Sequence, residues 1–219
     1  MLVTKFGPEP EGPSPHPLLV LLHGLGANEE DLVPMLDGLD RRLQAVFVRA
    51  PEPAAGLPGG YQWFPFGDPD LGAIDSALGE LEEPLVALTR AEDPEAPVEL
   101  FLGGFSQGAV IAAAYACRRV TPPLSGLILL SGHLPEAVSV PPLRGLPVFL
   151  GHGQDDPVVE YGRGRAMGDR LVAAGARLMR RVYRHGHSVT PQEIADVDQF
   201  LKGRLRLSRR LSGGPDPSP

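Results

Sequence analysis

The sequence predicts an α/β fold in which a mainly parallel central sheet of about seven strands carries helices on both faces. Short apolar runs alternate along the chain with segments of helical periodicity, which is the order typical of parallel strands joined by crossover helices. Several of these runs are apolar at every position, as strands covered on both faces should be. No segment between them is long enough to form a large lid domain.

Six apolar runs are predicted to be core strands, and residues 2–6 are a candidate edge strand. The six runs are 18–22 (LLVLL), 45–49 (AVFVR), 98–102 (VELFL), 125–130 (SGLILL), 146–150 (LPVFL) and 178–183 (LMRRVY). Each run is short and rich in residues that favour strands.

Five helices are predicted between and after these strands. They cover 28–38, 71–89, 107–118, 160–174 and 191–203. Asn28 is the expected N-cap of the first, and Thr190 followed by Pro191 gives the last a cap and a first-turn proline. In the second helix the apolar residues recur at spacings of four and three, which places them on one face. Pro84 interrupts that pattern and is expected to kink or split the helix.

The totals describe one soluble globular domain over residues 1–219. The chain has 219 residues, a net charge of −7 and 42% hydrophobic residues, which is enough to bury a substantial core. The core is expected to span about 16–206. The ends, 1–17 and 208–219, are rich in Pro and Gly and are expected to be loosely ordered.

The same totals argue against several classes of protein. A negative net charge does not suit nucleic acid as the main partner. The first residues do not resemble a signal peptide, and the apolar runs are too short to span a bilayer. We therefore expect a cytoplasmic protein without integral membrane association. The single cysteine, Cys117, excludes an internal disulfide and a cysteine-built metal site, and its helical position predicts a buried, inert thiol.

Residues 103–109, GGFSQGA, lie where a predicted strand passes into a predicted helix. Gly104, Ser106 and Gly108 match G-x-S-x-G, the pattern of a nucleophile elbow that holds a serine on a sharp turn. Its glycines are required because strand and helix crowd together there. A glycine-rich turn with a solvent-exposed serine is the structural alternative. The segment is not a phosphate loop, since no Gly-Lys-Ser/Thr follows it.

A serine nucleophile needs a base and an orienting acid, which on such a fold follow later strands in the order Ser, Asp, His. Asp155 and Asp156 come just after the LPVFL strand, and His185 and His187 come just after the LMRRVY strand. The carboxyl ends of parallel strands meet at one edge of the sheet, so these side chains are expected near Ser106. The sequence therefore predicts a Ser-Asp-His triad.

A metal site formed by the histidine pair, His152 and Asp155 is an alternative interpretation. It is disfavoured because a serine nucleophile leaves a metal-bound water no role. No metal and no cofactor are expected.

The segment LLHGLGAN, at 21–28, follows the first core strand and is the predicted source of an oxyanion donor. The backbone N–H groups of Leu25 and Gln107 are the expected pair. Gln107 begins a helix, whose free N–H groups face developing negative charge. His23 is expected to hold this loop through a hydrogen bond, and a role as a base is its alternative.

Taken together, LLHGLGAN, GGFSQGA, LLSGHLP, GHGQDDPVV and HGHSVTPQEI resemble the motifs of the phospholipase/carboxylesterase family of α/β-hydrolases. That family includes bacterial carboxylesterases and acyl-protein thioesterases. The resemblance runs from about residue 16 to about residue 203 and implies an α/β-hydrolase fold. It implies Asp156 as the acid, because this aspartate directly precedes a proline, and His187 as the base, because this histidine directly precedes a serine. It also implies Leu25 and Gln107 as oxyanion residues, and it matches Trp63 to a tryptophan of the family's long loop.

The sequence departs from the family pattern at three places. Its N-terminus is short, Pro84 interrupts the second helix, and His133 stands where the family has an aromatic residue in the SG-x-LP motif. These differences bear on the sheet edge and on the shape of the pocket, and they leave the three triad positions intact.

The connection 51–70 is long for a compact domain, and such loops are usually functional or disordered. Its aromatic content argues against disorder. Trp63, Phe64 and Phe66 are predicted to form a wall of an acyl pocket, with Val158 on the opposite wall. A satellite hydrophobic cluster is the alternative for the aromatic residues.

These observations predict a cofactor-free serine carboxylesterase that cleaves esters of small to medium acyl chain through an acyl-enzyme. Its partner is a small-molecule ester or thioester. Lysophospholipase and acyl thioesterase are the alternatives within this class, and a non-catalytic binding module is the alternative outside it. A homodimer is compatible with the sequence. A basic run near the C-terminus is expected to be a helix end and a solvated tail, and contact with an anionic surface is its alternative. The run consists of Lys202, Arg204, Arg206, Arg209 and Arg210.

Overall fold

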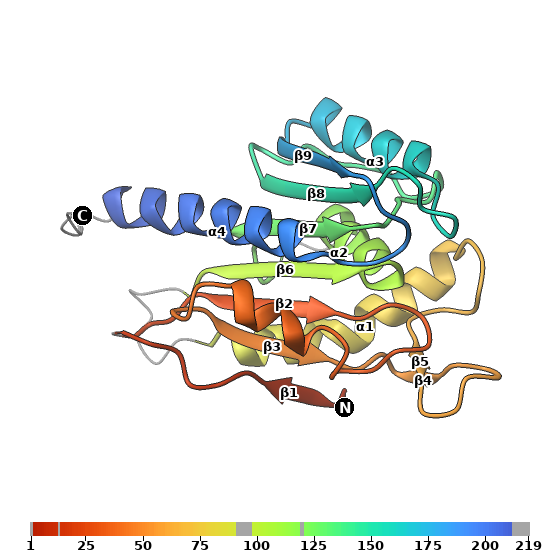
Figure 1. The fold of residues 1–219 in the computed structure, drawn as a ribbon, viewed down its shortest axis with the longest axis horizontal. Helices are drawn as coiled ribbons and strands as arrows, with labels where there is room; N and C mark the ends of the chain where they lie inside the picture. Colours follow the sequence, from red (N-terminus) through yellow and green to blue (C-terminus); the bar gives the residue numbers. More distant parts are fainter. Residues whose placement is uncertain (1, 13, 91–97, 119–120, 212–219) are drawn as a thin grey trace.

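The computed structural model describes residues 2–12, 14–90, 98–118 and 121–211, which build a seven-stranded sheet with helices on both faces (Figure 1). The strands are β1 (Thr4–Phe6), β2 (Leu18–Leu22), β3 (Gln44–Val48), β6 (Leu100–Phe105), β7 (Gly126–Leu130), β8 (Pro147–Gly153) and β9 (Arg177–Tyr183). Their order is β1-β3-β2-β6-β7-β8-β9, and only β1 runs antiparallel to its neighbour within this sheet. The predicted strands and the mainly parallel sheet are confirmed.

The helices are α1 (Leu71–Leu88), α2 (Gln107–Arg118), α3 (Tyr161–Ala173), α4 (Pro191–Leu211) and the short 3-10 helix η1 (Val33–Gly38). Strand β2 shows how they divide between the faces. Its Val20 and Leu22 belong to a core shared with α1, α2 and α3, whereas Leu19 and Leu21 belong to a core shared with η1 and α4. Successive side chains of a strand point to opposite faces, so a strand apolar at every position serves both cores.

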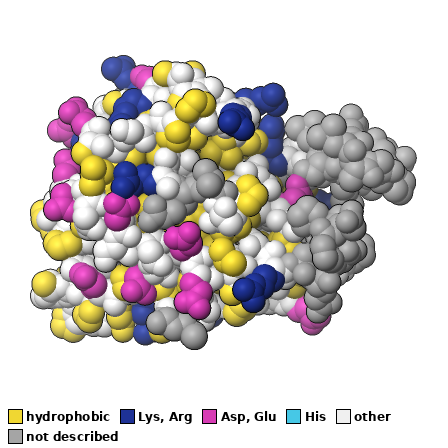
Figure 2. All heavy atoms as spheres, turned by 180° about the vertical axis from the view of Figure 1, so that it is seen from behind, with side chains coloured by type: hydrophobic (Ala, Val, Ile, Leu, Met, Phe, Trp, Pro, Cys, Tyr) yellow, Lys and Arg dark blue, Asp and Glu magenta, His cyan; other side chains and the backbone are white. Residues whose placement is uncertain are grey.

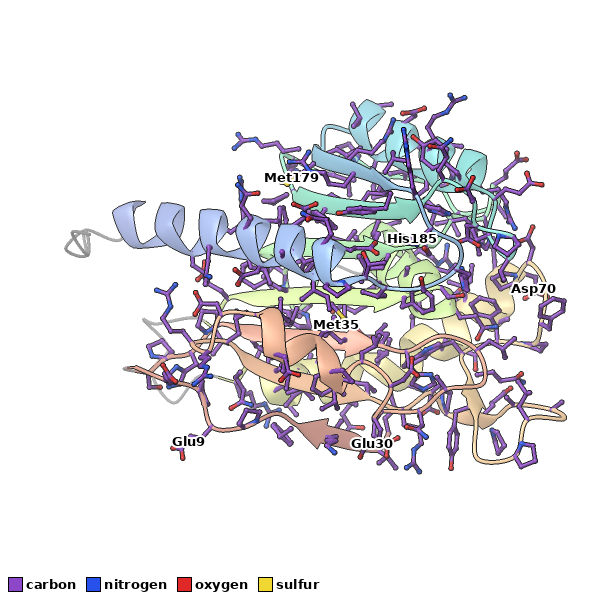
Figure 3. All side chains as sticks on the ribbon, viewed as in Figure 1. Glu9, Glu30, Met35, Asp70, Met179 and His185 are labelled. Atoms are coloured by element: carbon purple, nitrogen blue, oxygen red, sulfur yellow. The ribbon has the colours of Figure 1, made fainter. Side chains whose placement is uncertain are left out.

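The face formed by η1 and α4 is built around a few large side chains. Met35 extends from η1 toward the sheet (Figure 3), and Phe200 of α4 packs against Phe149 of β8 with ring centroids 5.9 Å apart. Burying each such side chain contributes about 1.5–3 kcal/mol to folding. On the opposite face, acidic and basic side chains are interspersed among apolar ones (Figure 2).

The predicted helix 28–38 is wrong over its first part. The Oδ1 atom of Asn28 accepts the backbone N–H of Glu30 at 2.9 Å, which closes a turn instead of capping a helix. Pro34 would remove one hydrogen bond from the middle of an α-helix here, because proline has no N–H. Only the 3-10 helix η1 forms, and it has proline in its first turn.

Helix α1, which was predicted to be kinked or split at Pro84, is not split and runs through that residue to Leu88. The carbonyl that loses its partner belongs to Glu80, an exposed residue that water can reach. Helix α4 continues past Gly203 to Leu211, because no proline follows until residue 215. Part of the segment predicted to be loose, 208–219, is therefore helical, and residues 212–219 lie outside the described residues.

All parallel strands end at the same edge of the sheet, where α2, α3 and α4 begin (Figure 1). The loops after β2, β3, β6, β8 and β9 therefore converge there. The loop after β3 contains a two-stranded sheet of β4 (Glu52–Pro53) and β5 (Tyr61–Gln62), which the sequence did not predict. Within the described ranges, no helix is long and apolar enough to cross a membrane.

Candidate active site

Ser106 lies between the last residue of β6 and the first residue of α2, with a φ of 55°. This left-handed conformation is strained for a residue with a side chain and typifies a nucleophile elbow. The two glycines have a steric cause. A Cβ at Gly104 would lie 2.3 Å from the backbone carbon of Gly108, and a Cβ at Gly108 would lie 2.0 Å from the carbonyl oxygen of Leu22. Only glycine lets strand and helix approach this closely.

The structure brings Asp156 and His187 to Ser106 in one chain of hydrogen bonds. Ser106 Oγ donates to His187 Nε2 at 2.9 Å, and His187 Nδ1–H donates to Asp156 Oδ2 at 2.7 Å. The ring of Phe105 packs against the imidazole with centroids 4.7 Å apart, which restricts its orientation. This is the arrangement in which an imidazole can take the serine proton.

Asp156 is buried and is held in its ionised form. Its Oδ1 accepts the backbone N–H groups of Val158 and Val159, each at 2.9 Å. Burial raises the pKa of this carboxyl, but the hydrogen bond from His187 and the two backbone N–H groups outweigh it, so the pKa lies below its ordinary value. Both oxygens are engaged, so the carboxylate can hold the imidazole in one orientation.

Asp155 and His185, the sequence neighbours of the two triad residues, do not join this chain of hydrogen bonds. Asp155 is exposed, and its backbone N–H bonds to the carbonyl of His185. The Nδ1 atom of His185 bonds to the carbonyl of Gly186 at 2.8 Å, and its Nε2 lies 3.5 Å from the carboxylate of Glu193. Neither side chain contacts Ser106.

Within the described ranges, no three His, Cys, Asp or Glu side chains are placed to hold a metal ion.

Two histidines near the site have structural contacts. His23 is buried: its Nδ1–H donates to Gly24 O at 2.7 Å and its Nε2 accepts the N–H of Ala50 at 2.9 Å. Burial lowers its pKa, so it is a neutral ring that holds the loop, as the sequence predicts. The sequence did not predict the role of His152, whose Nε2 donates to Val159 O at 2.8 Å and thereby supports the loop that carries Asp156. No sequence signal marks that contact.

Glu193, in the first turn of α4, is a further residue that sequence reasoning missed. Its carboxyl is fully buried beneath the loop that carries His187, and a Cβ at Gly151 would lie 2.3 Å from its Oε1. Burial raises its pKa to about 7, and the charge of Asp196 acts in the same direction. The Nε2 atom of His185 lies 3.5 Å from its carboxylate, at the edge of the sheet where α4 begins (Figure 3).

This raised pKa predicts a pH-dependent stability. The unfolded chain releases the proton of Glu193 near the ordinary value of 4.5, whereas the native protein keeps it up to about pH 7. Between these values the native state binds more protons, so the free energy of unfolding falls as the pH rises. This ionisation should lower the free energy of unfolding of the wild-type protein by about 3 kcal/mol. Glu193→Gln cannot ionise at this position, so it should lack this part of the pH dependence. Urea unfolding of both proteins at about pH 5 and about pH 8 measures it, and equal pH dependence in the two would contradict the assignment.

Leu25 and Gln107 lie beside Ser106, as predicted for oxyanion residues. Both line the cavity into which Ser106 and His187 open. In the part of the chain that the structure describes, neither backbone N–H has a hydrogen-bond partner. A Cβ at Gly24 would lie 3.2 Å from the Cβ of Ser106, so the loop that carries Leu25 packs directly on the serine.

The side chain of Gln107 has a separate contact that the sequence did not reveal. Its Oε1 accepts the backbone N–H of Trp63 at 3.1 Å, and its Nε2 donates to Phe64 O at 2.9 Å. The first residue of α2 therefore fastens the loop after β3 to the elbow. The sequence carries no signal for this contact, because Trp63 and Phe64 lie more than 40 residues before Gln107.

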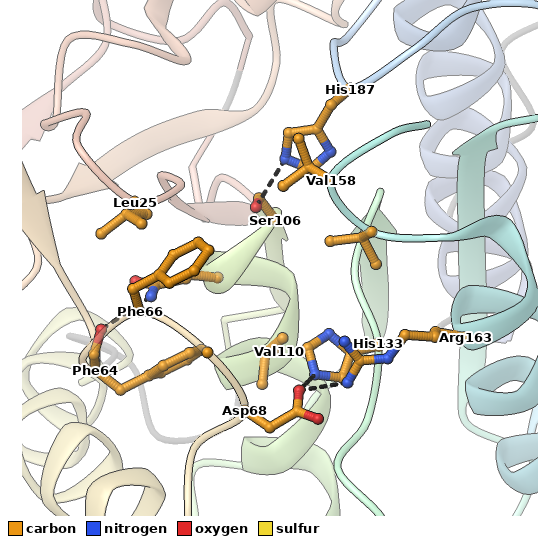
Figure 4. Close-up of a pocket in the computed structure, with 13 residues that line it drawn as sticks. Leu25, Phe64, Phe66, Asp68, Ser106, Val110, His133, Val158, Arg163 and His187 are labelled. Atoms are coloured by element: carbon orange, nitrogen blue, oxygen red, sulfur yellow. Dashed lines mark hydrogen bonds and ion pairs between the residues drawn. The ribbon is translucent and has the colours of Figure 1, made fainter. Parts of the chain in front are cut away.

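The cavity has a volume of about 350 Å³ and opens beside Ser106 (Figure 4). Phe64, Phe66 and Val158 line it, as predicted, and Phe66 and Val158 are 86% and 59% exposed at its rim. Its other lining residues are Leu25, Gly67, Asp68, Ser106, Gln107, Val110, His133, Val159, Arg163 and His187.

The prediction that Trp63 forms a wall of this cavity is wrong. Trp63 is buried behind it, where the indole N–H donates to His23 O at 2.9 Å and the ring lies against that of His23. The short strand β5 ends at the preceding residue, and Gln107 holds the backbone N–H of Trp63. These contacts turn the indole toward the loop after β2 and leave Phe64 at the cavity.

A family model described as Phospholipase/Carboxylesterase matches residues 9–205. An acyl-protein thioesterase 1 homolog of Dictyostelium discoideum is 26% identical over 205 residues, which cover 85% of this chain and 90% of that protein. The crystal structure of the Bacillus cereus carboxylesterase is similar in fold, with a TM-score of 0.79, 23% identity and coverage of 93% and 95% of the two chains. Acyl-protein thioesterase 2 of Zea mays gives a TM-score of 0.74 at 26% identity, covering 93% and 99%.

The family model spans most of the chain, and the solved structures that resemble it share its fold over nearly their whole length. On these grounds the chain belongs to the phospholipase/carboxylesterase family of α/β-hydrolases.

Proposed function

We propose that this hydrolase is a serine carboxylesterase that cleaves esters of small to medium acyl chain through an acyl-enzyme intermediate. The observation that carries the proposal is the position of His187, which hydrogen-bonds Ser106 at 2.9 Å and Asp156 at 2.7 Å. Ser106 is the nucleophile, His187 the general base and Asp156 the residue that orients the imidazole.

In the first half of the reaction, Ser106 Oγ bonds to the ester carbonyl carbon while its proton passes to His187 Nε2. The carbonyl π electrons move to oxygen and form a tetrahedral oxyanion. When the carbonyl re-forms, the bond to the alcohol oxygen breaks and His187 donates its proton to that alcohol. Asp156 stabilises the imidazolium and keeps its own charge.

In the second half, water replaces the alcohol. His187 takes a proton from the water as its oxygen bonds to the acyl carbon, and the second tetrahedral intermediate expels Ser106. His187 then returns the proton to Ser106 Oγ, and the carboxylic acid leaves. The balance of each half-reaction needs only ester and water.

The backbone N–H groups of Leu25 and Gln107 are proposed to bind the oxyanion. Their location beside Ser106 and the absence of hydrogen-bond partners for them in the described residues support this role. Gln107 also stands at the positive end of α2, which favours negative charge. Such donors typically contribute on the order of 10²-fold each to the rate.

The cavity supports a preference for small to medium acyl groups. Phe64 and Val110 give it apolar walls, and its volume of about 350 Å³ is near the lower end of ligand sites. Each methylene buried against these walls contributes up to about 0.8 kcal/mol, so kcat/KM should rise with chain length until the cavity is filled.

Trp63 should not shape that chain-length profile. Trp63→Phe removes the indole N–H and leaves the buried carbonyl of His23 without a partner, which is expected to cost about 1–3 kcal/mol of stability. Its kcat/KM profile for p-nitrophenyl esters from acetate to laurate should stay parallel to that of the wild-type protein. Phe64→Ala, which widens the cavity, is the matched variant that should change the profile. A flattened profile in Trp63→Phe alone would return Trp63 to the cavity wall.

A thioesterase activity is the second candidate, because the relative from Dictyostelium discoideum is named an acyl-protein thioesterase homolog. The proposed mechanism allows it, since a thiolate is a better leaving group than an alkoxide and depends less on protonation by His187. A lysophospholipase would use the same three side chains on a larger substrate.

A panel of substrates tests the proposal. It pairs p-nitrophenyl butyrate with its thioester analogue and adds a lysophosphatidylcholine, with Ser106→Ala as the blank. Cleavage of the oxygen ester above the blank is expected. A thioester preference above about tenfold in kcat/KM would assign the thioesterase instead, and no cleavage above the blank would reject a serine hydrolase acting on these substrates.

A further inference from the structure

Three polar side chains from separate segments meet at one end of the cavity. Asp68 Oδ1 accepts a hydrogen bond from His133 Nε2–H at 2.8 Å and another from the guanidinium of Arg163. They come from the loop before α1, the loop after β7 and the first turn of α3. All three line the same cavity as Ser106 and lie away from His187 in Figure 4. We refer to Asp68, His133 and Arg163 as the polar cluster.

The polar cluster is electrically balanced. The hydrogen bond from Arg163 and the charge of that residue hold the pKa of Asp68 below its ordinary value, so the pair is ionised. Burial, and then the nearby charge of Arg163, lower the pKa of His133, so the ring is neutral. The cluster therefore presents one anion, one cation and no net charge.

Unused hydrogen-bonding capacity remains in the cluster. Among the residues that the structure describes, Asp68 Oδ2 and the Nε and Nη1 groups of Arg163 have no protein partner. The side chains of Asp68 and Arg163 are 61% and 40% exposed, so solvent reaches this end of the cavity. A ligand at this end of the cavity meets both an acceptor and donors.

The proposed reaction places the leaving alcohol beside His187, away from the polar cluster. His187 must protonate the leaving alcohol, so the alcohol lies beside its Nε2. The acyl group extends from the carbon bound to Ser106 into the remainder of the cavity. Val110 and Val159 line the cavity together with the cluster. An acyl chain that extends along these two residues brings its far end to the polar cluster.

We propose that the polar cluster is a specificity determinant that selects acyl groups carrying a neutral hydrogen-bonding group, such as a hydroxyl, over plain alkyl chains of the same length. The inference rests on the proposed esterase function. A hydroxyl can donate to Asp68 Oδ2 and accept from an N–H group of Arg163, so it pairs with both the free acceptor and a free donor of the cluster.

An alkyl chain has the opposite effect at this place. It would displace water from an ion pair and return no hydrogen bond, and groups so desolvated are costly. A site built to bond a hydroxyl discriminates strongly against the analogue that lacks it. A carboxylate gains from Arg163 but is repelled by Asp68, so it should not be preferred.

The test compares matched substrates. The kcat/KM values of p-nitrophenyl hexanoate and octanoate are measured beside those of their ω-hydroxy and ω-carboxy analogues. The wild-type protein should prefer the hydroxy ester over the alkyl ester by about tenfold at one of the two lengths. Equal rates for hydroxy and alkyl esters at both lengths, or a preference for the carboxylate, would overturn the proposal.

Variants locate the effect. Asp68→Leu combined with Arg163→Met removes both charges together and should bring the ratio of hydroxy to alkyl ester to one or below. Arg163→Gln changes a single exposed side chain and should give an intermediate ratio of hydroxy to alkyl ester. This variant still tests the proposal if the double variant does not fold. Arg165→Met on the same helix, an exposed arginine outside the cavity, is the matched control and should keep the wild-type ratio. An unchanged ratio in Arg163→Gln would contradict the assignment.

Failure of this inference is distinguishable from failure of the proposed function. If the wild-type protein cleaves the esters by a Ser106-dependent reaction but shows no hydroxyl preference, only the polar cluster has been misread. If it cleaves none of them above the Ser106→Ala blank, the esterase proposal fails and this inference falls with it.

Discussion

Ser106→Ala is expected to lower kcat/KM for every cleaved ester by on the order of 10⁶, because the variant lacks the atom that forms the acyl-enzyme. Alanine suits the left-handed backbone at this position no worse than serine, so the fold should survive. The measurements are p-nitrophenyl ester hydrolysis and thermal unfolding of the two proteins. Activity within tenfold of the wild-type protein would remove Ser106 from the mechanism.

Ser131 offers a matched control for this substitution. It follows β7 at the same edge of the sheet, has a similar left-handed φ of 48° and is fully buried. Its hydroxyl has no hydrogen-bond partner within the described residues. Ser131→Ala should therefore retain activity. If it lost as much activity as Ser106→Ala, the loss in Ser106→Ala could come from a disturbed sheet edge and would not identify the nucleophile.

Asp156→Asn is expected to lower kcat by on the order of 10⁴, whereas Asp155→Asn should change it little. Asp156 Oδ2 accepts the Nδ1–H of His187, and an amide placed there favours the wrong imidazole tautomer. Asp155 is exposed and contacts no catalytic candidate through its side chain. Steady-state kinetics of both variants decide between the neighbours, and a larger loss in Asp155→Asn would show that the acid is the other residue.

Most of the sheet was predictable because several of its strands are apolar at every position. A run such as Leu18–Leu22 has few alternatives once helical periodicity is absent, and its burial on both faces follows from its composition. The helix predicted at 28–38 was wrong because local hydrogen bonding by Asn28 and the missing N–H of Pro34 outweigh its apolar periodicity. Patterns of hydrophobicity do not report such contacts.

The three reactive side chains were predictable because each follows a strand whose carboxyl end reaches one edge of the sheet. The resemblance to the family then chose Asp156 and His187 from their pairs, and the hydrogen bonds of the structure agree. The direction of Trp63 was not predictable, since it depends on a bond from its backbone to Gln107, 44 residues away. Contacts of this kind appear only when distant segments are brought together.

The polar cluster was hidden from the sequence for the same reason. Asp68, His133 and Arg163 belong to three segments without a shared motif. Only His133 gave a signal, as a departure from the aromatic residue of the family pattern. Its meaning depends on Asp68, which lies 65 residues earlier in the chain and bonds its ring.

The most direct test of the account is covalent capture of the nucleophile. A fluorophosphonate phosphonylates a serine only when an adjacent base activates its hydroxyl. After reaction with the wild-type protein, mass spectrometry of the peptides should find one adduct, on the peptide that contains Ser106. His187→Ala should lose this labelling, and His185→Ala should retain it. An adduct at another serine, or no adduct on the folded wild-type protein, would contradict the claim that His187 activates Ser106.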